Sequence, residues 1–336
     1  MEKNNYQGAL QQPLGSKFGA TTTAAEVIAG KDLTGKIAIV TGGNTGLGLE
    51  TTKVLAAAGA RVIILARDIE KAKLNLQDIP NVEIEAMNLM DPASIDVFAH
   101  KFLESERALH LLINNAGIMW VPLNRDSRGV ESQMATNYLG QYQLVSRLWP
   151  ALKSAKGARV VNVSSYGHQF APVNFEDINF EYRKYETLIA YGQSKTASNL
   201  FALELDERAK AFGVRAYSLH PGAIYGTELG RYASVDLFKE MGYFAEDGSL
   251  RPEILAGLKT VQQGAATTVW CATSPMLDQI GGVYCEDCDI AELDSGVKEE
   301  ANGLGSHGVQ EYSLDQQNAL KLWTWTEKVT GIPFYF

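Results

Sequence analysis

The chain has 336 residues, of which 46% are hydrophobic, and its formal net charge at pH 7 is −9 with a pI near 5.2. This acidic balance argues against nucleic acid or an anionic membrane as the main partner, although a substrate pocket can differ in charge from the whole. The length would permit two domains, but strand and helix patterns alternate from 37 to 284 without a linker, which predicts one α/β unit with a large core.

The amino-terminal segment 1–32 is polar and contains no apolar core of a secretory signal. We expect this segment to wrap the first layer of the domain as an arm. The longest apolar run, near 62–66, is far shorter than a membrane span. These features predict a cytoplasmic protein without membrane attachment, whose partner is a small-molecule substrate.

A glycine-rich turn follows the first expected strand. Residues 37–41 are an apolar run, residues 42–48 are Gly-Gly-Asn-Thr-Gly-Leu-Gly, and a helical pattern continues to about residue 58. This order predicts a dinucleotide site, because the free N–H groups at the start of the helix attract phosphate. Gly42 allows the tight turn, Gly46 lets the backbone approach the pyrophosphate, and Gly48 lets the helix pack on the strand. The nucleotide contacts expected in this turn are Gly42, Asn44, Thr45, Gly46 and Leu47.

The end of the second expected strand, 61–65, bears on the choice of cofactor. An acidic residue there would bind the ribose 2′-hydroxyl of NAD, but the chain has Arg67 after Ala66. A guanidinium suits a 2′-phosphate, so the sequence favours NADP(H) over NAD(H); an ordinary surface arginine is the alternative. Asp68 is expected to cap the next helix, and it keeps NAD possible.

Two later strands also end in polar residues. An apolar run at 111–113 leads into Asn-Asn-Ala-Gly at 114–117, and a strand at 159–163 leads into Ser164 and Ser165. Adjacent residues on a strand point to opposite faces, so only one of the two serines is expected to face a substrate. A long helical stretch between these strands contains Asn137.

Tyr191 and Lys195 are four residues apart, which places them on one face of a helix. An ammonium beside a phenol favours the phenolate. We therefore expect Lys195 to lower the pKa of Tyr191, so that the phenol can act as a general acid/base near neutral pH. By itself such a pair occurs by chance on many helices.

In this order the motifs resemble those of the short-chain dehydrogenase/reductase family, and the resemblance covers about 33–285. The matching elements are Thr-Gly-x-x-x-Gly-x-Gly at 41–48, Asn-Asn-Ala-Gly at 114–117, Asn137, Ser165, Tyr-x-x-x-Lys at 191–195 and Pro-Gly at 221–222. Val-Ser-Ser-x-Gly-His at 163–168, Phe-Glu-Asp-Ile-Asn at 175–179 and the long interval from Ser165 to Tyr191 are most similar to the retinol-dehydrogenase-like and protochlorophyllide-reductase-like branch. Membrane attachment, known in some retinol dehydrogenases, is not expected here.

The resemblance implies a single Rossmann-type, doubly wound parallel sheet with helices on both faces over 33–285. A lid after the sixth strand is expected at about 223–258, and 286–336 is expected to be a carboxy-terminal extension. That extension contains an acidic loop and a helix near 314–329, which would dock on the body or on another subunit of a homo-oligomer. Three cysteines, Cys271, Cys285 and Cys288, are expected to be reduced thiols, with a metal site or a disulfide less favoured.

The resemblance also implies a role for each catalytic residue. Tyr191 would protonate a carbonyl oxygen, and Ser165, preferred over Ser164, would hydrogen-bond the same oxygen. Lys195 would bind nicotinamide-ribose hydroxyls, and Asn137 would hold a water that links Lys195 to solvent. Additional cofactor contacts are expected from Asn88, Leu89, Asn115, Ala116, Gly117, Tyr191, Lys195, Pro221 and Gly222. Tyr225 stands where the family usually has threonine, so Ile224 and Thr227 are the candidates for the nicotinamide amide.

These residues predict an NADP-dependent alcohol dehydrogenase or carbonyl reductase. Aromatic lid residues, together with Met119, Trp120 and His168, suggest a largely apolar pocket, and His168 is an alternative acid/base. A C=C reductase of the protochlorophyllide-reductase type is a second possibility. A protein that binds NADP as a sensor without turnover is a third.

Overall fold

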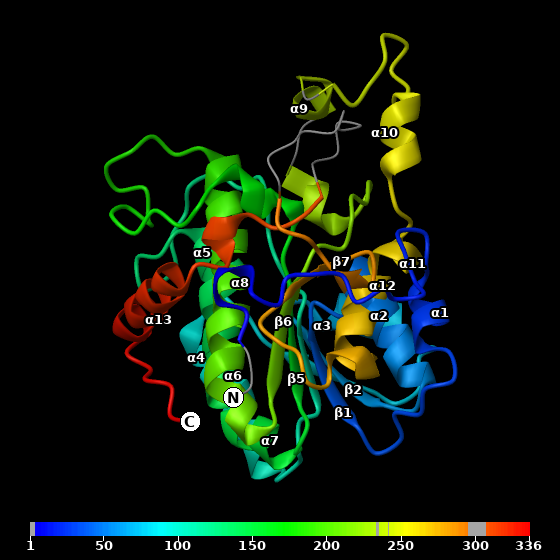
Figure 1. Cartoon of the computed structure of the whole chain (residues 1–336), viewed down its shortest axis with the longest axis vertical. Helices are drawn as coiled ribbons and strands as arrows, with labels where there is room; N and C mark the ends of the chain where they lie inside the picture. Colours follow the sequence, from blue (N-terminus) through cyan, green and yellow to red (C-terminus); the bar gives the residue numbers. More distant parts are fainter. Residues whose placement is uncertain (1–3, 233–234, 241, 295–306) are drawn as a thin grey trace.

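The computed structural model describes residues 4–232, 235–240, 242–294 and 307–336. Within these residues one sheet of eight strands runs through the molecule in the order β3-β2-β1-β4-β5-β6-β7-β8, with helices on both faces (Figure 1). The strands are β1 Ile37–Thr41, β2 Arg61–Ala66, β3 Val82–Ala86, β4 Leu111–Asn114, β5 Arg159–Val163, β6 Arg215–Leu219, β7 Tyr284–Glu286 and β8 Asp289–Ile290. This is the expected doubly wound, Rossmann-type fold.

Helices connect the strands and cover the sheet. The α-helices are α1 Ala24–Ile28, α2 Gly46–Ala57, α3 Ile69–Leu76, α4 Pro92–Glu104, α5 Ser132–Met134, α6 Gly140–Arg147, α7 Trp149–Ser154, α8 Thr187–Ala209, α9 Val235–Glu240, α10 Pro252–Gly257, α11 Val261–Gly264, α12 Ala266–Thr273 and α13 Gln316–Thr330. A π-helical turn, η2 Ala135–Leu139, joins α5 to α6. The 3-10 turns are η1 Tyr6–Gly8, η3 Tyr166–Phe170, η4 Lys210–Phe212, η5 Glu228–Tyr232, η6 Pro275–Leu277 and η7 Glu311–Ser313.

The central strands are buried on both faces, which explains their nearly continuous apolar sequences. Neighbouring strands from β3 to β7 pair in parallel, and only the last pair, β7 with β8, is antiparallel among the described strands. The sheet therefore runs on to Ile290, beyond the predicted end of the catalytic domain at 285. Because all the parallel strands end at one edge, the polar residues that follow them gather there.

Alternate residues of each strand contribute to two separate cores. Ile39 packs in a core with α4, α6, α7, α8 and α13, while Ala38 and Val40 pack in the other with α1, α2, α3 and α12. Figure 1 shows these two helix layers on opposite sides of the sheet. Period-two alternation on a doubly covered sheet produces this division.

The carboxy-terminal helix docks on the body of the protein. Leu322 and Trp323 of α13 are buried in the core that includes α8, and the Tyr138 hydroxyl hydrogen-bonds Thr326 Oγ1 at 2.5 Å. The helix predicted near 314–329 is confirmed, and it docks on the body of the protein; a contact with another subunit stays a prediction. Part of the predicted acidic loop, 295–306, lies outside the described residues.

The amino-terminal arm crosses the sheet instead of following only the first βαβ unit. Gln11 Nε2 donates to the carbonyl oxygens of Tyr284 and Ala291 at 2.6 and 2.7 Å, and the Tyr6 hydroxyl donates to Glu204. Further along the arm, α1 packs against α12 and α2. The prediction of an arm on the first layer is thus incomplete, because its first part caps the opposite edge.

The lid segment α9–α10 projects from the carboxyl edge of the sheet (Figure 1). Its two connections to the body are held together by a parallel bridge between Ala223 and Leu258. Residues 233–234 and 241 of the predicted lid lie outside the described residues. Among the described helices, none combines the length and apolar composition that crossing a membrane requires.

Candidate active site

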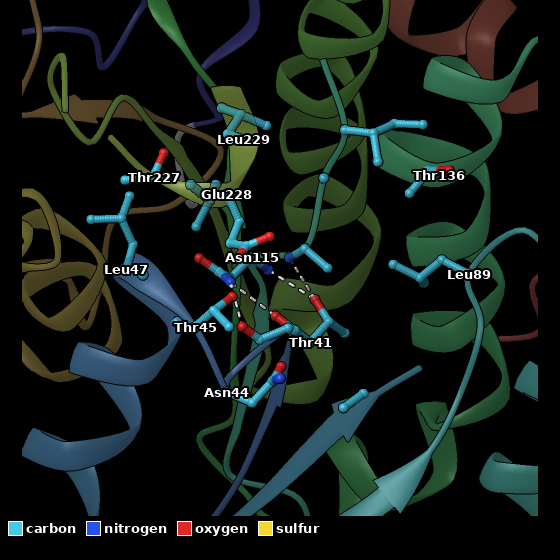
Figure 2. Close-up of a pocket in the computed structure, with 18 of the residues that line it drawn as sticks. Thr41, Asn44, Thr45, Leu47, Leu89, Asn115, Thr136, Thr227, Glu228 and Leu229 are labelled. Atoms are coloured by element: carbon cyan, nitrogen blue, oxygen red, sulfur yellow. Dashed lines mark hydrogen bonds between the residues drawn. The ribbon is translucent and has the colours of Figure 1, made fainter. Parts of the chain in front are cut away.

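A cleft of about 440 Å³ opens at the carboxyl edge of the sheet, where β1, β2, β4, β5 and β6 end (Figure 2). All but one of the predicted catalytic and cofactor residues line it, the exception being Asn137. Those that line it are Gly42, Asn44, Thr45, Gly46, Leu47, Arg67, Asn88, Leu89, Asn115, Ala116, Gly117, Ser165, Tyr191, Lys195, Pro221, Gly222, Ile224 and Thr227. The fold thus brings together residues that are up to 185 positions apart in the chain, from Gly42 to Thr227.

The glycine turn packs too tightly for side chains at its end. A Cβ on Gly48 would lie 2.3 Å from the carbonyl oxygen of Gly42, which is a severe overlap. Gly46 has φ +51°, a conformation that favours glycine, and a Cβ there would have only Thr227 within 4 Å. Asn115 Nδ2 braces the turn by donating to the carbonyl oxygen of Thr41 at 2.9 Å.

These residues fit the pyrophosphate of a dinucleotide. Thr45 is the residue before α2, and its side chain makes no capping hydrogen bond, so no side-chain cap takes up the N–H groups of the first turn. These groups and the positive end of the helix face the cleft, where an anion would satisfy them. Thr136 Oγ1, also at the cleft, is buried without a hydrogen-bond partner in the described part of the chain.

The adenosine side of the cleft is built at the end of β2. Arg67 lines the cleft, and Asp68 Oδ1 accepts a hydrogen bond from the backbone N–H of Lys71 at 3.0 Å, so Asp68 caps α3 as predicted. Asn88 also lines the cleft, and its Oδ1 accepts from the Met90 N–H at 3.1 Å. Asn88 therefore has the structure of a turn residue, with one lone pair of its carbonyl left for a ligand.

Tyr191 and Lys195 lie on α8 and are both almost completely buried, with exposures of 2% and 4%. Lys195 Nζ donates to the carbonyl oxygen of Val163 at 2.9 Å and lies 5.5 Å from the centre of the Tyr191 ring. Burial raises the pKa of Tyr191 to about 12, against the opposing effect of a hydrogen bond with Ser165. Burial likewise lowers the pKa of Lys195 to about 8.

The predicted lowering of the Tyr191 pKa by Lys195 is therefore wrong for this structure. Removing the phenol from water disfavours the phenolate by more than the hydrogen bond with Ser165 favours it. The hydrogen bond that the structure gives for the ammonium is made to the Val163 carbonyl oxygen. Tyr191 remains protonated throughout the neutral range, as a proton donor must.

The two serines after β5 have different environments. Ser164 is buried, and its hydroxyl donates to the backbone carbonyl of Lys195 at 3.1 Å. Ser165 Oγ accepts from the Gly167 N–H at 3.0 Å and hydrogen-bonds Tyr191. Ser165 thus contacts Tyr191 while Ser164 is tied to the backbone, and the role of Ser165 beside a reacting oxygen stays a prediction.

Gly167 lets the Tyr191 ring lie against the turn after β5. A Cβ at this glycine would be 2.6 Å from Tyr191 Cε1 and 3.3 Å from Ser165 Oγ. The position thus has no room for a side chain while the phenol and the serine keep their places. No role for Gly167 was predicted from the sequence, although this glycine belongs to the Val-Ser-Ser-x-Gly-His motif.

Asn137 does not line the cleft but contacts residues that do. It lies in the π-helical turn η2, where its Oδ1 accepts from the Ile118 N–H at 2.8 Å and its Nδ2 donates to the Ile118 carbonyl and to Ser194 Oγ. A Cβ on Gly117 would lie 3.1 Å from Asn137 Oδ1 and 3.5 Å from Lys195 Nζ. Asn137 therefore fixes the strand end beside Lys195, and π-turns of this kind are frequent at functional sites.

His168 does not line the cleft, contrary to its predicted place in the pocket. It is fully buried, with Nδ1 2.8 Å from the carbonyl oxygen of Ser165 and Nε2 accepting from the Gln310 N–H at 3.2 Å. Burial lowers the pKa of His168 to about 4. With both ring nitrogens bonded to backbone, its role is to join the end of β5 to the carboxy-terminal segment.

The lid contributes aromatic rings, which were predicted from the sequence, and charged side chains, for which no role was predicted. Phe238 of α9 contacts Trp120, Tyr225 and Tyr243 with ring centres 5.3 to 5.7 Å apart. Several other cleft residues had no individual role predicted from the sequence, among them Lys71, Thr136, Glu228 and Arg231. Lys71 was detectable in principle, because it lies in the first turn of the helix after β2.

The three cysteines are free and buried. Cys288 Sγ lies 3.9 Å from Thr267 Oγ1, and burial raises the pKa of the Cys288 thiol to about 12. Within the described part of the chain no group of three or more histidine, cysteine or acidic side chains is placed to hold a metal ion.

Comparison with known proteins places this cleft in a family. The short chain dehydrogenase family model matches residues 36–236. A protein of Streptomyces antibioticus named "Probable oxidoreductase" is 40% identical over 299 residues, covering 87% of this chain and 96% of that protein. Mouse retinol dehydrogenase 11 is 39% identical over 265 residues, covering 77% of this chain and 80% of that protein. The crystal structure of an uncharacterized protein from Mycobacterium paratuberculosis has a TM-score of 0.70 and 30% identity, covering 94% of this chain and all of that one.

Proposed function

The chain belongs to the short-chain dehydrogenase/reductase family, in its retinol-dehydrogenase-like branch, and we propose that it transfers hydride between NADP(H) and the carbonyl or alcohol carbon of a largely apolar small molecule. The observation that carries the proposal is the buried Tyr191 phenol, hydrogen-bonded by Ser165, in the same cleft as a glycine turn that fits a dinucleotide. A proton donor and a nucleotide site in one cleft are what carbonyl reduction requires.

A nicotinamide nucleotide, when bound, supplies the hydride that reaches the carbonyl carbon. Ser165 donates a hydrogen bond to the carbonyl oxygen and stabilises the negative charge that develops there. Tyr191 gives its proton to the same oxygen, and the alcohol is complete. The buried ammonium of Lys195, 5.5 Å from the ring, stabilises the phenolate that remains until it is protonated again. In the oxidising direction the same groups act in reverse.

The preference for NADP(H) rests on the charges at the end of β2. Arg67 and Lys71 both line the cleft where the ribose next to adenine would lie. Asp68, which directly follows Arg67, also lines the cleft, and its Oδ1 is engaged in capping α3. The charges of Arg67 and Lys71 favour a 2′-phosphate at this place.

The apolar substrate class rests on the lid and on one relative. Trp120, Tyr225 and Tyr243 surround Phe238 of the lid, and this aromatic cluster favours a substrate with apolar or aromatic surface. Retinol, in the name of the mouse relative, is an alcohol with a large apolar body. Fold alone does not fix the substrate, so this part of the proposal depends on the side chains of the lid.

The direct experiment is a panel of apolar ketones, aldehydes and enones, each tested for oxidation of NADPH and of NADH. We expect turnover with aldehydes or ketones, faster with NADPH, and product analysis showing the alcohol. Cofactor binding with no turnover across the panel, or products reduced only at C=C, would contradict the proposal.

Arg67→Ala tests the cofactor assignment separately. We expect the dissociation constant for NADP⁺ to rise at least tenfold while that for NAD⁺ changes little. Arg61→Ala is the matched control, because Arg61 lies on the same strand but at its other end. Equal dissociation constants for NADP⁺ in the two variants would contradict the assignment of Arg67 to the 2′-phosphate.

A further inference from the structure

One ion pair links the lid to the adenosine side of the cleft. Lys71 Nζ, on α3, lies 3.0 Å from Glu228 Oε1, at the start of η5 in the lid, and the two residues are 157 positions apart. Both line the cleft, and Figure 2 shows Glu228 with Thr227 and Leu229 on the lid side of it, above the glycine turn. The pair therefore bridges the mouth of the site.

Glu228 is also bound within the lid. Arg231 Nη1 donates to the Glu228 carbonyl oxygen at 2.9 Å and lies 3.9 Å from its carboxylate. Three cationic side chains therefore line the same cleft as Glu228, namely Arg67, Lys71 and Arg231. Asp68 Oδ1 accepts a hydrogen bond from the backbone N–H of Lys71, whereas the Lys71 ammonium makes its ion pair with Glu228.

This ion pair is weak enough for a ligand to replace it. The side chains of Lys71 and Glu228 are 43% and 50% exposed, and an ion pair in such a setting changes an equilibrium by at most about fivefold. A phosphate monoester carries about twice the charge of a carboxylate and offers three acceptor oxygens. A 2′-phosphate next to Arg67 would attract the Lys71 ammonium and repel the Glu228 carboxylate.

We propose that Glu228 determines cofactor specificity by competing with the ribose 2′-phosphate of NADP(H) for Lys71. The α3–lid ion pair opens when NADP(H) binds and persists when NAD(H) binds. Glu228 thus lowers the affinity for NADP(H) selectively, and the phosphate acts as the signal that frees the lid from α3. This inference rests on the proposed use of NADP(H).

Glu228→Gln tests the competition, because glutamine keeps the size of the side chain and removes its charge. Dissociation constants for NADP⁺ and NAD⁺ are measured by titration calorimetry on the full-length protein. We expect binding of NADP⁺ to tighten by about threefold to fivefold and binding of NAD⁺ to change less than about twofold. Glu246→Gln, which removes an exposed carboxylate elsewhere in the lid, is the control and should change neither.

Lys71→Met completes a double-mutant cycle. Alone it should weaken NADP⁺ binding threefold to tenfold, and in its presence Glu228→Gln should lose most of its effect. Unchanged or weaker NADP⁺ binding in Glu228→Gln, an equal gain for NAD⁺, or full additivity with Lys71→Met would overturn the inference. If Arg67→Ala leaves the preference for NADP⁺ over NAD⁺ intact, the assignment of NADP(H) as the cofactor is wrong. If Arg67→Ala removes that preference and Glu228→Gln has no effect, the assignment of NADP(H) holds and only the proposed competition for Lys71 is wrong.

Discussion

The ammonium of Lys195 lies 5.5 Å from the ring centre of Tyr191 and 2.9 Å from the carbonyl oxygen of Val163. A buried cation thus lies beside the phenol ring, while its hydrogen bond is made to the end of β5. Both groups are removed from water, so each has its ionised form disfavoured. The predictions for variants of Tyr191 and Lys195 depend on this burial of both side chains.

Lys195→Met should make the protein more stable and nearly inactive. With a pKa of about 8 in the folded state against 10.5 as the ordinary value, the unfolded state binds more protons between these pH values, so the stability of the wild type rises with pH across that window. Below pH 8 the full cost of burying the ammonium is present. We expect a gain of about 1 to 2 kcal/mol at pH 7, since loss of the Val163 hydrogen bond offsets part of that cost.

Denaturant unfolding of both proteins at pH 7 and pH 10 checks this prediction. The difference in unfolding free energy should shrink at the higher pH, where the lysine of the wild type is neutral in the folded state. Turnover should fall at least about 100-fold at pH 7. A variant that is less stable than the wild type at pH 7 would show that burial of the charge carries no net cost.

Ser165→Ala and Ser164→Ala separate the two serines. Ser165→Ala removes the hydrogen bond at the reacting oxygen, and kcat should fall by about 10²–10³. Ser164→Ala removes a buried bond to the Lys195 carbonyl, so it should cost about 1 to 2 kcal/mol of stability with less than about a tenfold effect on kcat. Steady-state kinetics and thermal melts of the pair distinguish these outcomes, and the reverse pattern would exchange the roles of the serines.

Gly167→Ala should damage turnover without touching a substrate. The added methyl group would overlap Tyr191 Cε1 at 2.6 Å and force the ring from its position. Displacement of a catalytic group by even 1 Å costs about 10²-fold, so we expect kcat to fall on that order. The affinity for NADP⁺ should stay within about threefold.

Gly19→Ala is the control for that substitution, because a Cβ there meets nothing within 4 Å and its φ is not in the left-handed region. It should leave kcat unchanged. Normal turnover in Gly167→Ala would mean that the phenol does not need its present position.

We expect the bond between His168 and the carboxy-terminal segment, made through the Gln310 N–H, to be sensitive to acid. Its pKa of about 4 lies below the ordinary 6.5, so its contribution to stability is present above pH 6.5 and is lost as the pH falls toward 4. Protonation of Nε2 removes the acceptor for the Gln310 N–H. Asp294 and the Tyr284 ring, which face the imidazole, do not offset its burial.

Melting temperatures from pH 7 to pH 4.5 test this attachment in the wild type and in His168→Gln, which keeps an acceptor but does not titrate. The wild type should lose stability more steeply than the variant as the pH falls. Parallel pH profiles would exclude His168 as the titrating group.

Much of the fold followed from the sequence because its signals are local. The strand from Ile37 to Thr41 and the glycines after it are contiguous, and apolar strands alternating with helices specify a doubly wound sheet. The cleft residues followed from the same logic, since the ends of parallel strands meet at one edge. Resemblance to a family then gave the roles of residues as distant as Ser165 and Tyr191.

What the sequence did not provide depends on tertiary burial. The pKa of Tyr191 was predicted to fall because spacing shows Lys195 but not the exclusion of water. His168 was placed in the pocket because a sequence cannot show that both ring nitrogens bind backbone. The pair Lys71–Glu228 joins segments 157 positions apart, and no local pattern encodes such a contact.

The most direct test of the proposed chemistry is the turnover of Tyr191→Phe with NADPH and an accepted carbonyl substrate. Phenylalanine keeps the ring against Gly167 and removes only the hydroxyl that Ser165 binds. We predict a fall in kcat/KM of at least about 10³-fold, with the NADP⁺ dissociation constant within about threefold of the wild type. Near-normal turnover in this variant would contradict the assignment of Tyr191 as the proton donor.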